Sequence, residues 1–527
     1  MTLQEKEVKE TKAQRVERIK KEKDGLDVLA DILRYAKTGE EVDPEDIDRF
    51  KWYGLYTQNK NLQGDDTKTY YMLRIKIEQG FLTTDQLLEV AKISKEFARD
   101  TADVTTRQDI QLHWVDIKDL PEIFLRLEKV GLNTFSAGDR PRNIVSCPVN
   151  GSDANEIEDV RDVVQELNDL YRLNHEFSNL PRKFKIGVGG CNKHCISHEV
   201  QDLSFTAVKK DNGKVLFSVA IGGGQASNKR IASHIGYIQR KDIVPLTTAV
   251  IRLFNEHGRR DNRAKARLGH LLEKWGEDRF LIELSLLSDI SFQEFDNIDF
   301  TPYPRRSHFG VIATKEKEYN NIGYALTSGR IGTKIYKLAN TLQFYNVKGI
   351  AFTTTQNIII IGVHKSITNV LTETLNEAVS LSTRPSVFQA RTLACTGLNF
   401  CKLAISETKN LSIDLVKYLS KKFPDFIEPI SISVNGCPNA CAHPHIVDLG
   451  FIGTMVKRGE QRVPGFNLVV GGCLSGVESK FAIKTPVKVT PKELPILIES
   501  FILEYDKSLN TDFQTFILEK YSNESNI

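Results

Sequence analysis

The sequence predicts an α+β protein built from an internal duplication with pseudo-twofold symmetry. Residues 104–110 read VTTRQDI and residues 352–358 read FTTTQNI, and each segment precedes a similar helical pattern. Further along, FSVAIGGG at 217–224 corresponds to FNLVVGGC at 466–473. Self-similarity of this kind indicates that one structural unit occurs twice in the chain.

Within each half, β-rich and helical segments alternate, which predicts layers of sheet and helix. Residues 70–77 alternate as a strand does, and residues 84–98 carry apolar side chains at helical spacing. Residues 259–275 are basic and then helix-patterned, so we expect them to connect the halves. The proline-containing segment 299–306 is the expected far boundary of this connection.

Composition limits the class of protein. A chain of 527 residues that is 40% hydrophobic has the length of about three or four domains and can bury a large core. Its eight cysteines are too few and too clustered for a disulfide scaffold, which indicates that the protein works in a reducing compartment of the cell. A net charge of +3, with no arginine-rich arm, gives no reason to expect a nucleic-acid partner.

No segment predicts secretion or a membrane partner. The first 25 residues are crowded with Lys, Arg and Glu and lack an apolar stretch, unlike a signal peptide. The longest strongly apolar stretch, 358–363, is far too short to span a bilayer. We therefore expect a cytoplasmic protein.

Four cysteines form two clusters, Cys395-x5-Cys401 and Cys437-x3-Cys441. A cubane iron–sulfur cluster needs four thiolates converging from different directions, and two short-range pairs on separate loops can supply them. The alternatives are a structural zinc site and buried thiols. Zinc ligand pairs usually stand two to four residues apart, so the five-residue gap fits zinc poorly.

The flanks of these cysteines, ACTGLNFCKLA at 394–404 and NGCPNACA at 435–442, resemble the cluster-binding motif of the siroheme-containing nitrite and sulfite reductases. The resemblance extends from about residue 50 to residue 501. It implies two ferredoxin-like half-domains and two larger α/β domains that hold siroheme and a 4Fe-4S cluster. The expected division is a charged N-terminal extension (1–50), a first ferredoxin-like half-domain (51–135), a first siroheme and substrate domain (136–260), a connecting segment (261–305), a second ferredoxin-like half-domain (306–385), a 4Fe-4S and siroheme-ligating domain (386–510) and a C-terminal tail (511–527).

The resemblance also implies roles for individual residues. In the family, the last cysteine of the set, here Cys441, both ligates the cluster and bridges to the siroheme iron. Asn439, in a turn-like Gly-Cys-Pro-Asn sequence, could orient backbone amides toward sulfur. The basic residues implied to surround the open face of the siroheme iron and bind the substrate oxyanion are Arg74, Arg142, Lys183 and Lys185. Those implied to contact the carboxylates and ring of siroheme are Arg74, Arg107 and Gln108.

The implied reaction is the six-electron reduction of sulfite to sulfide or, alternatively, of nitrite to ammonia. On a strand, Lys183 and Lys185 project from the same face, so two ammonium groups could meet one anion. Nitrite-reducing members of the family typically carry asparagine at the second of these positions, so Lys185 favours sulfite. Sulfite is also the more highly charged oxyanion near neutral pH, and a second cation adds more for it.

The chain has no glycine-rich loop with nucleotide-binding spacing, so the electron donor must be a separate protein. Within the family that donor is usually ferredoxin, which is acidic. The basic cluster Arg259, Arg260, Arg263, Lys265 and Arg267 could attract it, could bind siroheme carboxylates, or could lie in solvent. A monomer is expected.

The first half carries an unexpected set of thiols. Cys191-x3-Cys195 repeats the spacing of Cys437 and Cys441, and Cys147 offers a third sulfur. A second cubane would lack its fourth cysteine, which favours a relic of the duplication over a metal site. Two other classes remain: a non-catalytic siroheme or iron–sulfur electron carrier, and a zinc-stabilised interaction protein. Neither explains the cysteines together with the cations.

Overall fold

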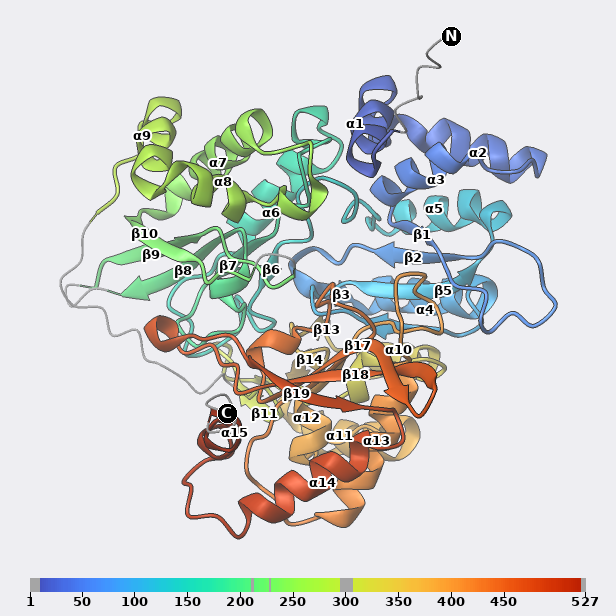
Figure 1. Ribbon diagram of the computed structural model, residues 1–527, viewed down its shortest axis with the longest axis vertical. Helices are drawn as coiled ribbons and strands as arrows, with labels where there is room; N and C mark the ends of the chain where they lie inside the picture. The colour runs from blue at the N-terminus through green and yellow to red at the C-terminus, as the bar shows by residue number, and fades with distance from the viewer. Residues whose placement is uncertain (1–9, 210–212, 227–228, 294–306, 523–527) are drawn as a thin grey trace.

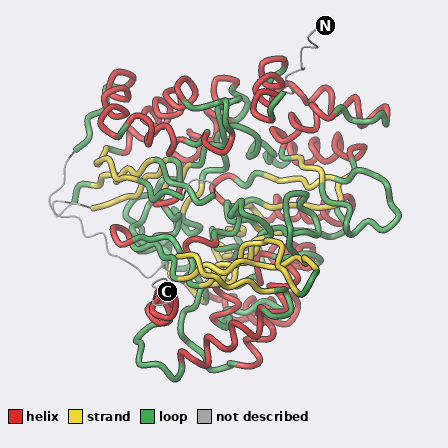
Figure 2. The backbone as a smooth tube through the Cα atoms, in the orientation of Figure 1, coloured by secondary structure: helices red, strands yellow, loops and turns green. Residues whose placement is uncertain are grey.

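The computed structural model describes residues 10–209, 213–226, 229–293 and 307–522. Its described strands form four sheets, and the sheets come in two matched pairs (Figure 1). In the view of Figure 2, strands occupy the middle of the molecule and helices lie at its upper and lower edges. The predicted α+β duplication is therefore confirmed. The expected boundary at 299–306 lies outside the described residues.

The first matched pair consists of the two ferredoxin-like sheets. The first sheet has the order β1 (Leu55–Thr57), β2 (Tyr71–Ile75), β5 (Ile110–Val115) and β4 (Asp103–Val104), with helices α4 (Thr84–Phe97) and α5 (Leu120–Lys129). The second has the order β11 (Gly310–Ala313), β12 (Tyr319–Tyr324), β14 (Ile358–His364), β13 (Gly349–Phe352) and β3 (Phe81–Thr83), with α10 (Lys334–Phe344) and α11 (Thr368–Val379). Because β3 comes from the first half, the two sheets share one hydrophobic core.

The second matched pair consists of two mixed sheets with the same topology. One has the order β10 (Ser233–Ile238), β9 (Val215–Ile221), β8 (Leu203–Lys209), β7 (Ile186–Gly189) and β6 (Val145–Ser146), with α6 (Arg161–Tyr171), α7 (Ile243–His257), α8 (Leu268–Trp275) and α9 (Glu277–Leu287). The other has the order β15 (Thr392–Ala394), β16 (Ile432–Asn435), β17 (Leu449–Arg458), β18 (Gln461–Val470) and β19 (Ile483–Val489), with α12 (Val387–Arg391), α13 (Lys409–Lys422), α14 (Leu494–Tyr505) and α15 (Phe513–Ser522). In each, the first three strands along the chain run parallel and the later pairings are antiparallel.

Backbone conformation repeats between the halves at single-residue level. Gln108 and Gln356, at equivalent places in the repeated heptapeptides, have φ values of 62° and 61°. Each side-chain amide reaches a backbone carbonyl of the other half: Gln108 Nε2 donates to Phe352 O at 2.7 Å, and Gln356 Nε2 donates to Val104 O at 2.9 Å. A left-handed backbone is uncommon for residues other than glycine. Its recurrence here shows that the two copies kept the same turn.

The chain ends pack onto this framework. Helices α1 (Lys12–Glu22), α2 (Leu29–Thr38) and α3 (Pro44–Arg49) precede β1, and α1 begins with a capping box between Thr11 and Gln14. Lys20 is buried and contacts the Asp139 carboxylate and the Leu180 carbonyl, each at 2.9 Å. Helix α15, in the segment expected as a tail, adds four buried side chains to the core beneath β15–β19. Among the described residues, no helix is long and apolar enough to cross a membrane.

Candidate active site

The four predicted cluster cysteines lie at one edge of the β15–β19 sheet. Cys395 follows β15 and Cys437 follows β16, and these neighbouring strands run parallel, so the loops leaving them meet. The Gly436 N–H donates to Cys395 Sγ at 3.2 Å. Burial and the neighbouring Cys441 raise the pKa of Cys395 to about 12, and Cys441 also raises the pKa values of Cys401 and Cys437, after burial. Cys441 is therefore within electrostatic reach of each of the other three thiols.

Cys441 differs from the other three because its side chain is exposed. It follows Ala440, whose φ of 54° turns the backbone sharply, and its carbonyl accepts a hydrogen bond from Thr106 Oγ1 of the first half at 3.1 Å. Asn439 is also exposed. Burial raises the pKa of Cys437, and a hydrogen bond from the backbone N–H of Asn439 partly opposes this rise. An exposed thiol beside one buried and two partly buried thiols suits a sulfur that also faces a second metal centre.

A loop from the first half holds the loop that carries Cys395 and Cys401. The Asn59 N–H donates to Phe400 O at 2.7 Å, and the side chains of Asn59 and Asn61 donate to Leu398 O at 3.1 and 3.2 Å. The Phe400 ring stacks on His113 with centroids 3.9 Å apart. These supports were not predicted, because isolated asparagines and a histidine in strand β5 form no recognisable motif.

Gly397 allows the tight turn between the two cysteines of this loop. Its φ is 75°, and a Cβ there would lie 2.3 Å from Thr408 Oγ1. A side chain at this position would displace the residue that contacts Cys395. The glycine in the Cys-Thr-Gly sequence is thus required by both backbone conformation and space.

Lys183 and Lys185 lie on the extended segment that enters β7. Phe184, between them, is fully buried and pairs with Pro141, whereas both lysines are half-buried on the other side. Burial, with Arg267 and Arg142, lowers the pKa of Lys183 to about 7, and Cys441 opposes this shift. Burial and Lys183 hold the pKa of Lys185 well below its usual value. Two lysines thus lie close together in a space with an excess of positive charge, and Lys183 also lies near Cys441.

Arg74 on β2 and Arg142 border the same space. Arg142 is held by carbonyls, with Nη1 donating to Ser136 O at 3.2 Å and Nη2 to Gly138 O at 2.6 Å. The Nε atoms of Arg74 and Arg142 are buried without a hydrogen-bond partner in the described chain. Although burial alone would raise the pKa of Tyr56, these two arginines lower it. Buried cationic donors without a protein partner suit an anionic ligand, and Tyr56 lies beside both arginines.

Arg107 and Gln108 are buried near Arg74 and Arg142, and most of their hydrogen-bond donors are used within the protein. Arg107 donates to Asn143 O at 3.1 Å, Gln201 Oε1 at 3.0 Å and Ile186 O at 3.0 Å, and burial lowers its pKa to about 9. Gln108 Nε2 donates to Ser146 O as well as to the carbonyl of the other half. Their contact with a cofactor stays a prediction; what the contacts establish is that both residues hold neighbouring segments in place.

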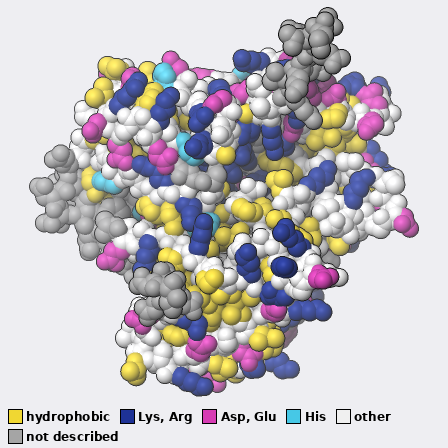
Figure 3. Space-filling model, viewed as in Figure 1, with side chains coloured by type: hydrophobic (Ala, Val, Ile, Leu, Met, Phe, Trp, Pro, Cys, Tyr) yellow, Lys and Arg dark blue, Asp and Glu magenta, His cyan; other side chains and the backbone are white. Residues whose placement is uncertain are grey.

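The basic cluster that follows α7 is largely paired. Arg260 contacts Glu17 at 2.8 Å, Arg263 contacts Asp139 at 2.8 Å, and Arg259 pairs with the adjacent Asp261 at 2.6 Å. Arg267 forms two contacts with Asp202, at 2.6 and 3.0 Å, and lowers the pKa values of both active-site lysines after burial. Arg267 therefore lies near the two lysines and adds to the positive charge around them. In Figure 3, Lys and Arg side chains gather in the recess in the upper half of this face.

The residues fit the two cofactors that the sequence suggests. Four converging thiols with backbone N–H support suit an iron–sulfur cluster, and the surplus of buried cations suits the carboxylates of siroheme and a small oxyanion. This combination defines a class, an iron–sulfur oxidoreductase that acts on an anion.

Comparison with known proteins identifies the family. A model described as the nitrite and sulphite reductase 4Fe-4S domain matches residues 137–290 and 390–512, and one described as the nitrite/sulfite reductase ferredoxin-like half domain matches residues 63–130. The chain is 35% identical to "Sulfite reductase [ferredoxin] 1" of Mycolicibacterium paratuberculosis, over 95% of this chain and 93% of that one. It is 33% identical to "Ferredoxin--nitrite reductase" of Leptolyngbya laminosa, over 88% and 91%.

A solved structure agrees. The Mycobacterium tuberculosis NirA protein superposes with a TM-score of 0.89 and 31% identity, over 95% of both chains. This chain belongs to the nitrite and sulphite reductase family. It is an oxidoreductase of that family, with a 4Fe-4S cluster and siroheme as its cofactors.

Proposed function

We propose that this protein reduces sulfite to sulfide with six electrons supplied by ferredoxin. The observation that carries the proposal is the placement of Lys183 near Cys441 and of Lys185 next to Lys183, with Arg142 beside Lys183 and Arg74 beside Tyr56. The relatives support the wider class, because some are named sulfite reductase [ferredoxin] and others ferredoxin–nitrite reductase. Reduction of nitrite to ammonia by the same site is the second candidate.

Four cysteines would hold the cluster, with Cys441 shared with siroheme, and the cofactors would supply single electrons and an iron that binds substrate. The chain's own task is to attract the anion and to deliver protons. Arg74 and Arg142, with their partnerless Nε atoms, would bind the oxyanion and the carboxylates around it. Arg107 and Gln108 would hold the backbone of Asn143 and Phe352 in place beside the siroheme. The backbone N–H of Asn439 would support the cluster sulfur of Cys437.

Lys183 is suited to proton donation because its pKa of about 7 lies near the working pH of most enzymes. A bound oxyanion favours the ammonium form of Lys183. That ammonium group can then supply one of the two protons with which an oxygen leaves as water, and Lys185 in its ammonium form can supply the other, while the two electrons would come from the cofactors. Sulfite is favoured over nitrite because its higher charge gains more from the second lysine.

We place the docking site for ferredoxin beside Cys401. Lys402 and Leu403, directly after this cysteine, are exposed. Burial lowers the pKa of Lys402, and Lys60, next to Asn59, is close enough to lower it further. These two cations suit an acidic partner next to the cluster. The paired cluster at Arg259–Arg267 is less available for that role. The monomeric state, the cytoplasmic location and the domain boundaries stay predictions.

Viologen-driven turnover tests the proposal, since a chemical reductant bypasses the natural donor. The assay compares kcat/KM for sulfite and nitrite while measuring sulfide and ammonium directly. We expect both to be reduced, with sulfite preferred, and we expect Lys185→Asn to lower this preference. Preference for nitrite in the unaltered enzyme would favour the second candidate. Turnover of neither by protein that contains both cofactors would contradict the enzyme assignment.

A further inference from the structure

The first half retains three of the four cysteine positions that hold the cluster in the second half. Cys147 follows β6 and Cys191 follows β7, as Cys395 follows β15 and Cys437 follows β16. Cys195 corresponds to Cys441, and the residues just before these two, His194 and Ala440, share left-handed backbone with φ of 61° and 54°. The first half therefore presents the same sulfur-bearing turn on the same scaffold, without a counterpart to Cys401.

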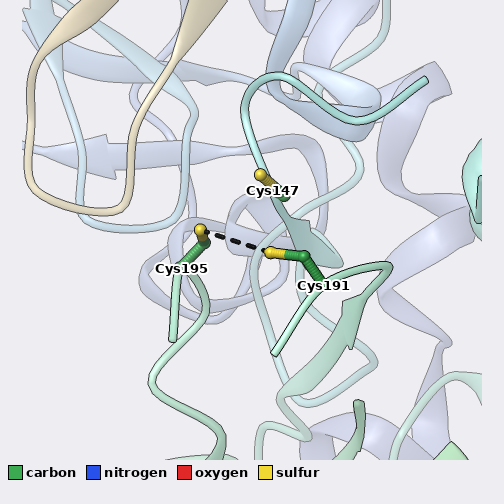
Figure 4. Close-up of side chains that lie close together, drawn as sticks. All are labelled: Cys147, Cys191 and Cys195. Carbon is green, nitrogen blue, oxygen red and sulfur yellow. Dashed lines mark hydrogen bonds between the residues drawn. The ribbon is translucent and has the colours of Figure 1, made fainter. Parts of the chain in front are cut away.

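The three sulfur atoms point toward one another (Figure 4). All three lie within 4.8 Å of each other, and Cys191 Sγ is 3.8 Å from Cys195 Sγ. The three residues are buried, with exposed fractions of 3%, 5% and 7%. In the described part of the chain, neither of the two groups of metal-ligand atoms at this spacing includes the four cluster cysteines. The first-half sulfurs are therefore packed more tightly than those of the second half.

A fourth ligand comes from a distant part of the chain. His308, which precedes β11, places Nε2 3.7 Å from Cys195 Sγ. A tetrahedral zinc ion with Zn–S bonds of about 2.3 Å and a Zn–N bond of about 2.0 Å separates two sulfurs by about 3.8 Å, and sulfur from nitrogen by about 3.5 Å. The two observed separations are close to these values. The three sulfurs lie within 4.8 Å of one another in a group that does not include His308, so its ring would move toward Cys147 and Cys191 when a metal binds.

We propose that Cys147, Cys191, Cys195 and His308 bind one zinc ion in a closed, four-coordinate structural site. The separation of the sulfurs is too short for a cubane, whose four iron and four sulfide atoms must fit between the thiolates. It is also too long for a disulfide, whose sulfurs are about 2.05 Å apart. A relic of duplication explains three buried thiols but not a histidine that arrives from the other half. Three thiolates and one imidazole are a common set for structural zinc.

The site joins the two halves of the molecule. The cysteines belong to the β6–β10 domain and pack against Ala351, Ile359 and Ile361 of the second ferredoxin-like sheet, to which His308 leads directly. Thr354 Oγ1 of that sheet's loop donates to Cys195 O at 2.7 Å. Zinc would thus fix the junction at the pseudosymmetric counterpart of the catalytic cluster. This role does not depend on which oxyanion the enzyme reduces.

Metal analysis of the purified full-length holoenzyme tests the proposal. We expect about one zinc per chain in addition to the iron of the cofactors, and we expect Cys191→Ser and His308→Ala to reduce zinc to below about a tenth per chain. Cys473→Ser, which alters a cysteine outside both sites, is the control and should retain the zinc. X-ray absorption at the zinc edge of the unaltered enzyme needs no variant, and should show three sulfur ligands and one nitrogen ligand.

Three results would overturn the assignment. Protein without zinc would do so, as would zinc bound only by oxygen and nitrogen. Iron and sulfide in excess of one cubane and one siroheme, lost in Cys191→Ser, would show a second cluster instead.

Discussion

The two halves of the molecule present the same turn after equivalent strands but differ in what the turn can bind. In the second half, Cys401 completes a wide set of four thiols and Cys441 is exposed beside the lysines. In the first half no cysteine corresponds to Cys401, the remaining thiols are buried and close together, and His308 stands next to Cys195. One added cysteine and one exposed thiol therefore distinguish an electron-transfer site from a structural one on a common scaffold.

The largest expected difference between the halves is the loss of turnover when the last cysteine of each turn is replaced. Cys441→Ser should lower turnover at least about 1,000-fold and change the visible spectrum, because in the proposed function both cofactors depend on this sulfur. Cys195→Ser should leave kcat within about threefold while zinc is lost. Viologen turnover, spectra and metal content measure these effects. Equal loss of activity in the two variants would show that the first-half cysteines serve the chemistry.

Lys183 tests the comparison further. Reduction of the substrate near the second-half cluster needs a proton donor, whereas a structural metal site in the first half does not. Replacement by Arg keeps the charge but removes the ability to release a proton near neutral pH. We expect kcat to fall about 100-fold with KM changed only a few-fold.

The pH profile checks the same role. Lys183 is protonated below its pKa of about 7, so kcat/KM of the unaltered enzyme should decline as the pH rises through that value. The decline should disappear in Lys183→Arg, whose guanidinium stays charged. An unchanged profile in this variant would remove Lys183 as the proton donor.

Electron entry should be confined to the second-half site. Charge reversal at Lys60 and Lys402 should raise the KM for ferredoxin about five- to tenfold at low salt, since two exposed cations are lost. Viologen-driven turnover should be unaffected. Arg259→Glu, which alters an exposed and paired arginine elsewhere, is the matched control. If only the control weakens turnover with ferredoxin, the docking site lies near α7.

The smallest effects concern two equivalent threonines. Thr106 donates to Cys441 O at 3.1 Å and Thr354 donates to Cys195 O at 2.7 Å, each from the opposite half. Thr354→Val should lower the free energy of unfolding by about 1–2 kcal/mol, because a buried carbonyl loses its donor. Thr106→Val should cost less, since water can reach its partially exposed site. Chemical denaturation of both variants measures the difference, and a larger loss in Thr106→Val would contradict it.

Much of this architecture could be predicted from sequence because local patterns determined it. The repeated heptapeptides predicted the duplication, and the predicted elements at 70–77 and 84–98 became β2 and α4, within a few residues. The spacing of the cluster cysteines predicted one ligand set, and the parallel strands β15 and β16 bring the loops that carry Cys395 and Cys437 together. The alternation of Lys183, Phe184 and Lys185 likewise predicted two lysines on one side of the chain.

The remaining features depend on contacts between distant segments, which no local pattern reveals. Strand β3 joins the sheet of the other half, Asn59 reaches the cluster loop, and Arg267 pairs with Asp202 beside the lysines. From the sequence, the first-half thiols are best interpreted as a relic of the duplication, because no fourth cysteine accompanies them. His308 lies 113 residues beyond Cys195, and only the fold brings the two side chains together.

Anomalous diffraction from crystals of the holoenzyme, recorded at the iron and zinc absorption edges, tests the difference between the halves most directly. Our account predicts iron among Cys395, Cys401, Cys437 and Cys441, and zinc alone among Cys147, Cys191, Cys195 and His308. Iron at both positions, or no metal at the first-half position, would contradict it.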